Sequence, residues 1–550
     1  MNEVFEQYQF QSSWDEMIDN NGQPREGCED LYKAILRFSK EEFDERCNER
    51  DRSFMDRGVT FSLSGKESPF PLDPIPRVIT GGEWDVVERG VSQRVKALEM
   101  FLKDVYTDGE ITLDGVIPKS LVYNSGGFKR EAYGIVPVNG VRIPVAGMDI
   151  VRDESGELFV LEDNVRTPSG ASYVLENRRA MTRIFPSLLA EHNIRPVASY
   201  PLTLLSALRA QAPPSCSGDP VIVVLTPGVF NSAYFEHSFL ARQMGVELVE
   251  GRDLICRNNK VYMKTTEGET RVDVVYRRVD DDFLDPLAFR PDSLIGCAGI
   301  LNAARAGNVS VTSAVGNSIA DDKLIYTYVP EMIRYYLSEE PILKNVPSFD
   351  PQDPLAMEYI EENIENLVIK PVDASGGYGL VIGSNASDEV LKDTLEKIRR
   401  DRRGFVAQPI VKLSTAPTKV GDVLEPRHVD LRPFAVNLGS SVAVLPGGLT
   451  RVALSRGSLV VNSSQGGGSK DTWVVDTPRV PSIWMTPPSD VNALSHDEKG
   501  FFKRERSTQT FSEMDHFVSV RQELRPQQEI QQQSSLGANP SIDAIASIDC

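Results

Sequence analysis

The segment MDIVRDESGELFVLEDN, residues 148–164, constrains the fold of this chain more than any other part of its sequence. Two runs of alternating residues flank a turn signal centred on Ser155 and Gly156, so the segment is predicted to form a β-hairpin. Folding about that centre places Asp149 opposite Glu162 on the neighbouring strand. Directly opposed residues have Cβ atoms about 5 Å apart, so the hairpin brings two carboxylates together.

The same register places Val151 opposite Val160 and puts Asn164 on the same side of its strand as Glu162. Two carboxylates this close repel each other unless a cation or a proton lies between them. Magnesium prefers hard oxygen ligands and usually takes few carboxylates, and an asparagine adds an oxygen without charge. Asp149, Glu162 and Asn164 are therefore candidate magnesium ligands. The alternative is an edge hairpin with a solvated polar face, and a one-residue register slip would separate the three side chains.

A glycine-rich loop follows another apolar run. Lys370 ends the run LVIK, and the loop DASGGYG contains Gly376, Gly377 and Gly379. Such a loop exposes backbone N–H groups to a phosphate, and a lysine at its mouth supplies a positive charge. The loop is not a P-loop, because no Gly-Lys-Ser/Thr follows, and it lacks the helix that the Rossmann fingerprint requires. A glycine-rich hairpin turn is the alternative.

Two further polar segments are candidates for binding anions. Lys323 lies in ADDKLIYTYV and is predicted on the first turn of a helix, where a surface lysine is the ordinary alternative. In RHVDLRPFAV, strand alternation puts His428, Asp430 and Arg432 on one face. This cluster is either a structural ion-pair network or an anion site, since arginine matches carboxylate and phosphate groups.

Length and charge narrow the class of protein. The 550 residues exceed what one hydrophobic core usually holds, so two or three packed units are expected. A net charge of −20 makes nucleic acid and anionic membrane surfaces poor main partners. The six cysteines are scattered, which argues against a zinc ribbon or a disulfide framework and fits a reducing compartment. The N-terminus lacks a secretory-signal pattern, and no apolar run approaches the roughly 20 residues that span a bilayer, so a cytoplasmic protein is expected.

The order of predicted elements indicates an α/β fold. A helix is predicted from about Gly82 to Tyr106, and strands and helices alternate from Pro220 onward. The last stretch is rich in Gln, Ser, Asn and charge, which predicts disorder. The predicted units are an N-terminal helical and loop extension (1–80), a first core segment with the hairpin (81–215), an inserted α/β unit (216–320), a second core segment with the glycine loop (321–486) and a mostly disordered tail (487–550).

In combination, these motifs resemble one known family. The segments LVIKPVDASGGYG, FVAQPIV, LEDNVRTPSGASYVLENR, RHVDLRPFAV and VNSSQGGGSKDTWV look like those of the circularly permuted ATP-grasp type 2 proteins, which are similar in fold to glutathionylspermidine synthetase. The resemblance covers roughly residues 70–485. The permutation explains why the hairpin with Asp149 precedes Lys370, whereas ordinary ATP-grasp chains have the opposite order. The resemblance implies a permuted ATP-grasp core with a smaller inserted α/β unit.

The resemblance also implies a function, which is ATP-dependent carboxylate–amine ligation through an acyl phosphate, with release of ADP and phosphate. The substrates would be a small-molecule or short-peptide carboxylate and an amine, and the cofactors ATP and Mg²⁺. The candidate catalytic residues are Arg432, Asp430 and His428, of which Asp430 or His428 would manage the amine proton. The other implied site residues are the metal ligands Asp149, Glu162 and Asn164, the phosphate lysines Lys323 and Lys370, the loop residues Ser375, Gly376 and Gly377, and Gln408, Pro409 and Ile410 along an adenine slot.

One departure from the family bears on activity. The synthetase has an arginine two residues before its first metal aspartate, and this chain has Gly147 there. Arg152 and Arg166 are candidate substitutes for that arginine. A non-catalytic ATP-binding partner module is therefore the alternative to a ligase. A dikinase-like phosphotransferase would need a phosphorylatable histidine carrier, and none is evident among the five histidines.

Overall fold

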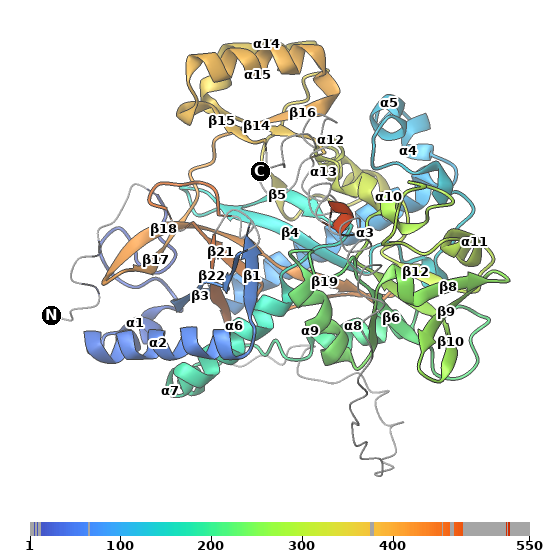
Figure 1. Cartoon of the computed structure of the whole chain (residues 1–550). Coiled ribbons are helices and arrows are strands. Elements are labelled where there is room, and N and C mark those ends of the chain that lie inside the picture. The colour runs from blue at the N-terminus through green and yellow to red at the C-terminus, as the bar shows by residue number, and fades with distance from the viewer. Residues whose placement is uncertain are drawn as a thin grey trace, which may run out of the picture.

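A large β-sheet runs through the middle of the computed structural model (Figure 1). The structure describes Phe5, Tyr8 and residues 13–63, 66–373, 379–453, 455–461, 467–476, 524 and 526–528. Its mixture of helices and several sheets confirms the predicted α/β class. The central path of the large sheet is β13 (Lys344–Asn345), β5 (Leu158–Asn164), β4 (Val145–Arg152), β18 (Val423–Arg432), β21 (Leu449–Val452), β22 (Gly468–Val475) and β3 (Leu72–Thr80), and β17 (Thr415–Val420), β19 (Phe434–Asn437) and β20 (Val442–Val444) extend it.

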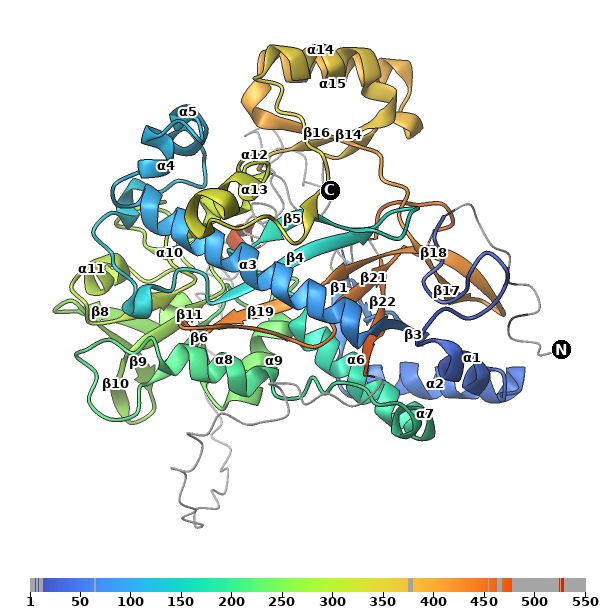
Figure 2. The same cartoon turned by 180° about the vertical axis from the view of Figure 1, so that it is seen from behind.

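Helices cover both faces of this sheet. The long helix α3 (Gly81–Val105) runs across one face (Figure 2), and its apolar stripe, which includes Val87, Val91 and Leu98, is buried. This helix confirms the prediction made from the spacing of its apolar residues. On the other face, α6 (Ala171–Ile184) packs against β21 and β22. The sheet is therefore sandwiched between helices.

The hairpin forms as predicted, with one difference in register. Asp149 pairs with Glu162, but Val151 pairs with Phe159 rather than with Val160. The turn differs from the predicted one, and a β-bulge in β5 just before Glu162 compensates for the difference. Because of this bulge, the expected pairing holds at the end of the hairpin that carries the two carboxylates.

Strand β5 alternates between the candidate metal patch and the core. Glu162 and Asn164 lie on the face of Asp149, while Asp163 points to the opposite face, toward α3. There Asp163 and Arg94 form a fully buried ion pair, with Arg94 Nε 2.9 Å from Oδ1 and Nη2 2.5 Å from Oδ2. This pair ties α3 to the strand that carries two of the candidate metal ligands.

We expect Arg94→Met to lower the free energy of unfolding by about 3–5 kcal/mol, because it leaves the buried Asp163 carboxylate without its counterion. Combining it with Asp163→Leu should recover much of the loss, since both charges are then absent from the core. Denaturant unfolding followed by circular dichroism measures both effects. Arg89→Met, on the exposed side of the same helix, is the matched control and should stay within about 0.5 kcal/mol of wild type. An unchanged midpoint for Arg94→Met would contradict this role.

A second, parallel sheet lies at the side of the large one (Figure 1). Its strand order reverses between β6 and β11, and ligands of open α/β sheets bind beside the carboxyl ends of the strands at such a reversal. The sheet consists of β12 (Ser310–Thr312), β11 (Val274–Arg277), β6 (Ile222–Leu225) and β7 (Glu247–Val249), and its neighbours are α8 (Tyr200–Arg209), α9 (Tyr234–Met244), α11 (Ile300–Arg305) and the antiparallel strands β8 (Leu254–Arg257), β9 (Lys260–Thr265) and β10 (Gly268–Val272).

A small unit with its own hydrophobic core stands above the large sheet (Figure 1). Ile360, Ile369 and Ile398 from its helices and strands are buried together in that core. Its sheet has the order β15, β14, β16, and β14 carries Lys370 near its end. The bounds are α14 (Pro354–Asn363), β14 (Leu367–Pro371), β15 (Val381–Ile382), α15 (Asp388–Arg400) and β16 (Phe405–Pro409).

The N-terminal helices pack on the far end of the large sheet. Helices α1 (Glu29–Ile35) and α2 (Lys40–Asp56) contribute Leu31 and Phe43 to a buried cluster that includes Trp473 of β22. In the part of the chain that the structure describes, no helix combines the length and the apolar character that a membrane span requires.

Four described residues, Leu524 and residues 526–528, lie within the predicted tail. Leu524 and residues 526–528 are helical, and Leu524 is buried within the main core cluster. A single leucine in ELRPQQ makes no periodic pattern, which is why composition predicted no packing here. The rest of the predicted disordered tail, residues 487–550, lies outside the described residues.

Candidate functional site

Asp149 lies at the centre of a buried ion-pair network formed by β4, β18 and β21. Arg432 binds it through Nε, 2.5 Å from Oδ1, and Nη2, 2.8 Å from Oδ2. Arg451 Nη2 donates to Oδ2 at 2.8 Å and also pairs with Asp430, which faces it across β18 and β21. Burial raises the pKa of the Asp149 carboxyl, but the two arginines outweigh burial and hold it well below its usual range.

Glu162 and Asn164 complete an oxygen-rich patch beside Asp149. Asn164 Nδ2 lies 3.4 Å from Glu162 Oε1, and Arg432 Nη2 lies 4.0 Å from the same oxygen. Glu162 and Asn164 are only partly buried, so a small ion can reach them. Two carboxylates and an amide oxygen fit magnesium, which takes the rest of its octahedral shell from water and substrate phosphates. This patch has two carboxylates and an amide, and in the described ranges no group of three or more His, Cys, Asp or Glu side chains is arranged for a metal.

Gly147 leaves space that Arg432 occupies. A Cβ atom at residue 147 would lie 3.3 Å from Cδ and 3.5 Å from Cγ of Arg432, whose side chain passes over the glycine to Asp149. A guanidinium thus reaches Asp149 from β18 rather than from two residues earlier on β4. Arg152, named above as a candidate substitute, pairs with Glu16 instead.

The two predicted phosphate lysines come from segments that are distant in sequence. Lys370 is half-buried, and its pKa falls to about 8 because burial disfavours the ammonium more than the attraction of Glu162 favours it, while Lys323 repels it. Lys323 begins α12 (Lys323–Tyr326), as predicted, and its Nζ lies 3.4 Å from the Val372 carbonyl oxygen. Lys370 therefore interacts electrostatically with Glu162, with Asp149 and with Lys323.

The lowered pKa of Lys370 predicts how anion binding depends on pH. Below about pH 8 the ammonium is charged and attracts a phosphate. Above that pH, binding must also take up a proton, so affinity for metal-free ATP should fall by up to about tenfold per pH unit toward about pH 9.5. Calorimetry in the presence of EDTA measures this. Lys370→Arg, which stays charged, should remove the pH dependence, and a fall that persists in this variant would contradict the assignment.

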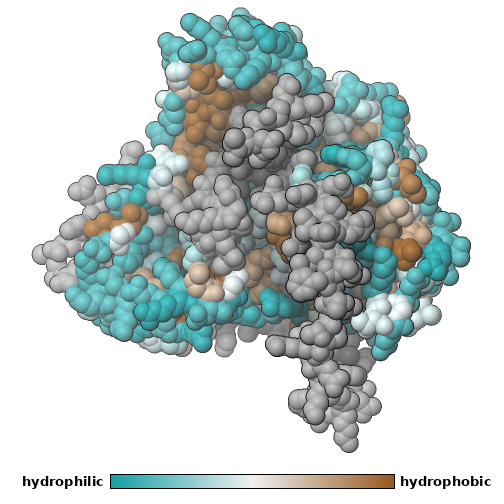
Figure 3. Space-filling model, viewed as in Figure 1, coloured by the Kyte–Doolittle hydropathy of each residue, from teal (hydrophilic) through white to brown (hydrophobic). Residues whose placement is uncertain are grey.

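The predicted adenine slot lies at the end of β16 in the small unit. Gln408 is buried, its Nε2 donates to Ser348 Oγ at 2.8 Å, and its Oε1 has no hydrogen-bond partner among the described residues. Pro409 follows, and the Ile410 N–H donates to the Asn366 carbonyl oxygen at 3.1 Å. Apolar surface gathers on one flank of the small unit (Figure 3). The predicted loop residues Ser375, Gly376 and Gly377 lie outside the described residues.

His428 and Asp430 are engaged in internal contacts. His428 Nδ1 lies 2.9 Å from the Leu413 carbonyl oxygen, and burial lowers the pKa of the imidazole. Asp430 is buried, and its carboxylate pairs with Arg451. Of the three predicted catalytic residues, Arg432 is the one that hydrogen-bonds to a candidate metal ligand within the described structure.

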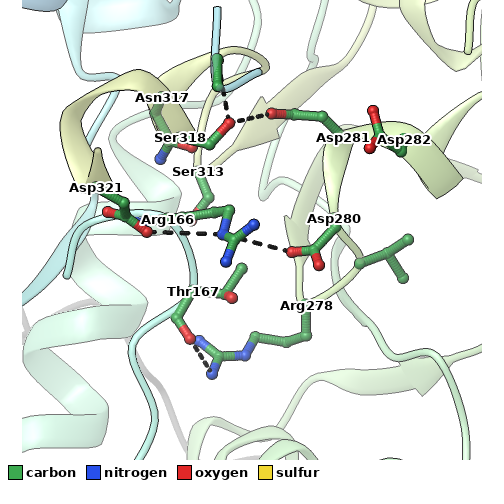
Figure 4. Close-up of polar contacts among 12 residues, drawn as sticks. Arg166, Thr167, Arg278, Asp280, Asp281, Asp282, Ser313, Asn317, Ser318 and Asp321 are labelled. Atoms are coloured by element: carbon green, nitrogen blue, oxygen red, sulfur yellow. Dashed lines mark hydrogen bonds and ion pairs between the residues drawn. The ribbon is translucent and has the colours of Figure 1, made fainter. Parts of the chain in front are cut away.

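A second polar cluster forms where the segment after β5 meets the carboxyl ends of β11 and β12 (Figure 4). Arg166 lies between two carboxylates, with its Nε 3.6 Å from Asp280 Oδ1 and 3.6 Å from Asp321 Oδ2. Asp321 accepts hydrogen bonds from the N–H groups of Val165 and Arg166, yet burial raises its pKa to about 6. Arg166 therefore faces this cluster and not Asp149.

Arg278 connects this cluster to the Asp149 network. Its Nη2 donates to the Thr167 carbonyl oxygen at 3.0 Å (Figure 4). It also donates to the Pro168 carbonyl oxygen at 3.0 Å and to Ser169 Oγ. Arg432 Nη1 lies 3.4 Å from the Ser169 carbonyl oxygen. The loop between β5 and α6 is thus held between an arginine of the parallel sheet and an arginine of the large sheet.

Sequence reasoning missed the roles of Arg278, Asp321 and Arg451. Signals for two of them were present in the sequence. RRVDDDF directly follows the buried strand VDVVY, and charged residues that follow a parallel strand commonly lie at a site. Asp321 stands two residues before Lys323. Arg451 carries no such signal, because its partner Asp430 is assigned only by the pairing of β18 with β21.

Comparison with known proteins identifies close relatives. A family model described as circularly permuted ATP-grasp type 2 matches residues 76–453. An uncharacterized protein of Mycobacterium leprae is 58% identical over 466 residues, which cover 85% of this chain and 83% of that protein. An uncharacterized protein of Synechocystis sp. is 50% identical over 466 residues, which cover 84% and 97%.

One further relative and one solved structure are more distantly similar to this chain. A Frankia alni protein named "putative glutamate–cysteine ligase 2-3" is 43% identical over 474 residues, which cover 86% of this chain but 54% of that protein. Its name therefore describes a longer protein, much of which lies outside the match. A glutathione synthetase-like effector from Globodera pallida superposes with a TM-score of 0.50 at 13% identity, covering 78% of this chain and 96% of that one. This likeness shows a shared fold.

Proposed function

The chain belongs to the circularly permuted ATP-grasp type 2 family, and on that premise we propose that it is an ATP-dependent carboxylate–amine ligase that acts through an acyl phosphate. The observation that carries the proposal is the patch formed by Asp149, Glu162 and Asn164 on the β4–β5 hairpin, with which Lys370 interacts electrostatically. The proposed cofactors are ATP and Mg²⁺, and the proposed substrates are a small-molecule or short-peptide carboxylate and an amine.

The proposed nucleotide complex uses charges that are already in position. Magnesium would be held by Asp149, Glu162 and Asn164, and it would neutralise part of the charge on the phosphates. Lys323 and Lys370 bind phosphate oxygens from the side of the small unit. Since these groups need little reorganisation during the reaction, they stabilise charge that develops on the transferred phosphoryl group.

The proposed chemistry has two steps. A substrate carboxylate oxygen attacks the γ-phosphorus, the bond from that phosphorus to the β-phosphate oxygen breaks, and ADP leaves. The amine nitrogen then attacks the acyl carbon, the bond from that carbon to the phosphate oxygen breaks, and phosphate leaves as the amine loses a proton.

Residue roles in these steps follow from position. Arg432, beside Asp149, is assigned to the transferred phosphoryl group. Asp321, whose pKa lies near 6 in the neighbouring cluster, is assigned to accept the amine proton in place of Asp430 or His428.

A non-catalytic ATP-binding partner module is the alternative. This alternative was considered because residue 147 is a glycine and not an arginine. Arg432 passes over Gly147 and supplies a guanidinium at Asp149, so the glycine is a weaker argument for a non-catalytic module. The ligase is therefore the function that the site supports best.

Trapping with hydroxylamine tests the proposal. An acyl phosphate is electrophilic, and hydroxylamine is small enough to reach it whatever the natural amine is. With Mg-ATP, hydroxylamine and a panel of amino acids and short peptides, we expect a hydroxamate and an equal amount of ADP. Mg-ATP binding without hydroxamate from any acid would favour the binding module. AMP in place of ADP would exclude the acyl-phosphate route.

A further inference from the structure

The described C-terminal residues lie beside the reversal point of the parallel sheet. Both views place them, in red, between the β4–β5 hairpin and α10 (Asp281–Leu284) (Figures 1 and 2). Their hydrogen bonds go to two loops, one that follows β6 and one that follows α10. These loops flank the carboxyl ends of β6 and β11, the edge at which ligands of open α/β sheets bind, and the space between the two loops is called the crevice below.

Gln527 binds the loop after α10 with both ends of its carboxamide. Its Oε1 accepts a hydrogen bond from the Leu294 N–H at 2.7 Å, and its Nε2 donates to the Asp292 carbonyl oxygen at 2.6 Å. A carboxamide is both a donor and an acceptor, so it satisfies this pair of backbone groups with one side chain. A carboxylate or an ammonium in the same place would satisfy only one of them.

Gln528 is 3% exposed and lies against the loop after β6. Its Oε1 accepts from the Phe230 N–H at 3.4 Å. A Cβ atom at Gly228 would lie 2.3 Å from Gln528 Nε2, so the glycine provides the space for this amide. Leu524, 9% exposed, adds an apolar anchor within the main core cluster. An apolar anchor with two carboxamides at positions +3 and +4 is a helical recognition pattern.

We propose that the crevice between these two loops is a peptide-binding surface, and that Leu524–Gln528 of this chain is its resident occupant. The surface fits a peptide with a leucine followed at +3 and +4 by carboxamide side chains. The crevice adjoins α10, whose N-terminal cap Asp280 belongs to the Arg166 cluster, so a peptide there lies beside the proposed substrate side of the site. In this respect the inference rests on the proposed function and deepens it by naming a peptide as the substrate class.

The proposal is tested with the full-length chain and a fluorescent synthetic peptide of residues 518–534. In the wild type the resident segment competes at an effective concentration on the order of 1 mM, so the added peptide should bind weakly. The Leu524→Ala/Gln528→Ala double variant should bind the peptide at least about tenfold more tightly, as measured by anisotropy without ATP. Pro526→Ala, at an exposed position of the same segment, is the matched control and should bind like wild type.

Amide hydrogen exchange provides a second readout on the same variants. The Phe230 and Leu294 N–H groups donate to the segment, so their exchange should accelerate in the double variant and slow again when the peptide is added. Equal peptide binding by wild type and the double variant, or no binding by either, would overturn the proposal. Neither measurement uses ATP, so their failure and the failure of the hydroxamate assay are distinguishable.

Discussion

Lys370→Ala is expected to lower the rate of hydroxamate and ADP formation by about a hundredfold or more. One preorganised positive charge at a transferring phosphoryl group is worth a few kcal/mol, because it acts in a partly buried site without reorganisation. Lys370 meets these conditions, since it is half-buried and interacts electrostatically with Glu162 and Asp149. Steady-state ADP release and hydroxamate colorimetry measure the loss.

Two matched variants separate charge from folding in this experiment. Lys370→Arg keeps the charge and should retain much of the activity that Lys370→Ala loses. Lys397→Ala removes an exposed lysine from α15 of the same small unit and should leave the rate unchanged. Wild-type turnover by Lys370→Ala would contradict the assignment of this lysine to the phosphates.

Glu162→Gln is expected to weaken magnesium-dependent ATP binding by about a hundredfold or more. Even residues that contact a metal only through its ligands change affinity by about ten- to a hundredfold, and Glu162 is proposed as a direct ligand. Its side chain is partly exposed, so the fold should be unaffected. Calorimetry with Mg-ATP measures the effect, and metal-free ATP should bind the variant at least as well as wild type.

Glu157→Gln is the control for the metal prediction. Glu157 lies on the same hairpin and pairs with Lys344 at the surface, so its loss removes an equal charge without touching the patch. Equal Mg-ATP affinity in Glu162→Gln and Glu157→Gln would show that the metal does not bind at this hairpin.

The candidate metal patch was predictable because its geometry is local. Alternation within one short segment was sufficient to place Asp149 opposite Glu162 and Asn164 beside it. The bulge in β5 was not predictable, because no residue type in the strand demands it. Two deviations, one in the turn and one at the bulge, cancel at the end of the hairpin that carries the carboxylates.

Other features depend on contacts between distant segments, which a single sequence does not report. Gly147 suggested a missing arginine, yet the guanidinium comes from Arg432 on a strand far along the chain. The role of Arg166 is fixed by Asp280 and Asp321, which belong to other segments. Leu524 is buried although its surroundings in sequence are polar, and the side chains of the neighbouring Gln527 and Gln528 accept hydrogen bonds from the Leu294 and Phe230 N–H groups.

The fate of the carboxylate oxygen tests the proposed ligase most directly. An acid that yields hydroxamate is labelled with ¹⁸O in its carboxyl group and incubated with the protein, Mg-ATP and hydroxylamine. Attack of that oxygen on the γ-phosphorus, followed by departure of phosphate, predicts one ¹⁸O in each released phosphate together with unlabelled ADP. Unlabelled phosphate, or ¹⁸O found in AMP, would contradict an acyl phosphate as the intermediate.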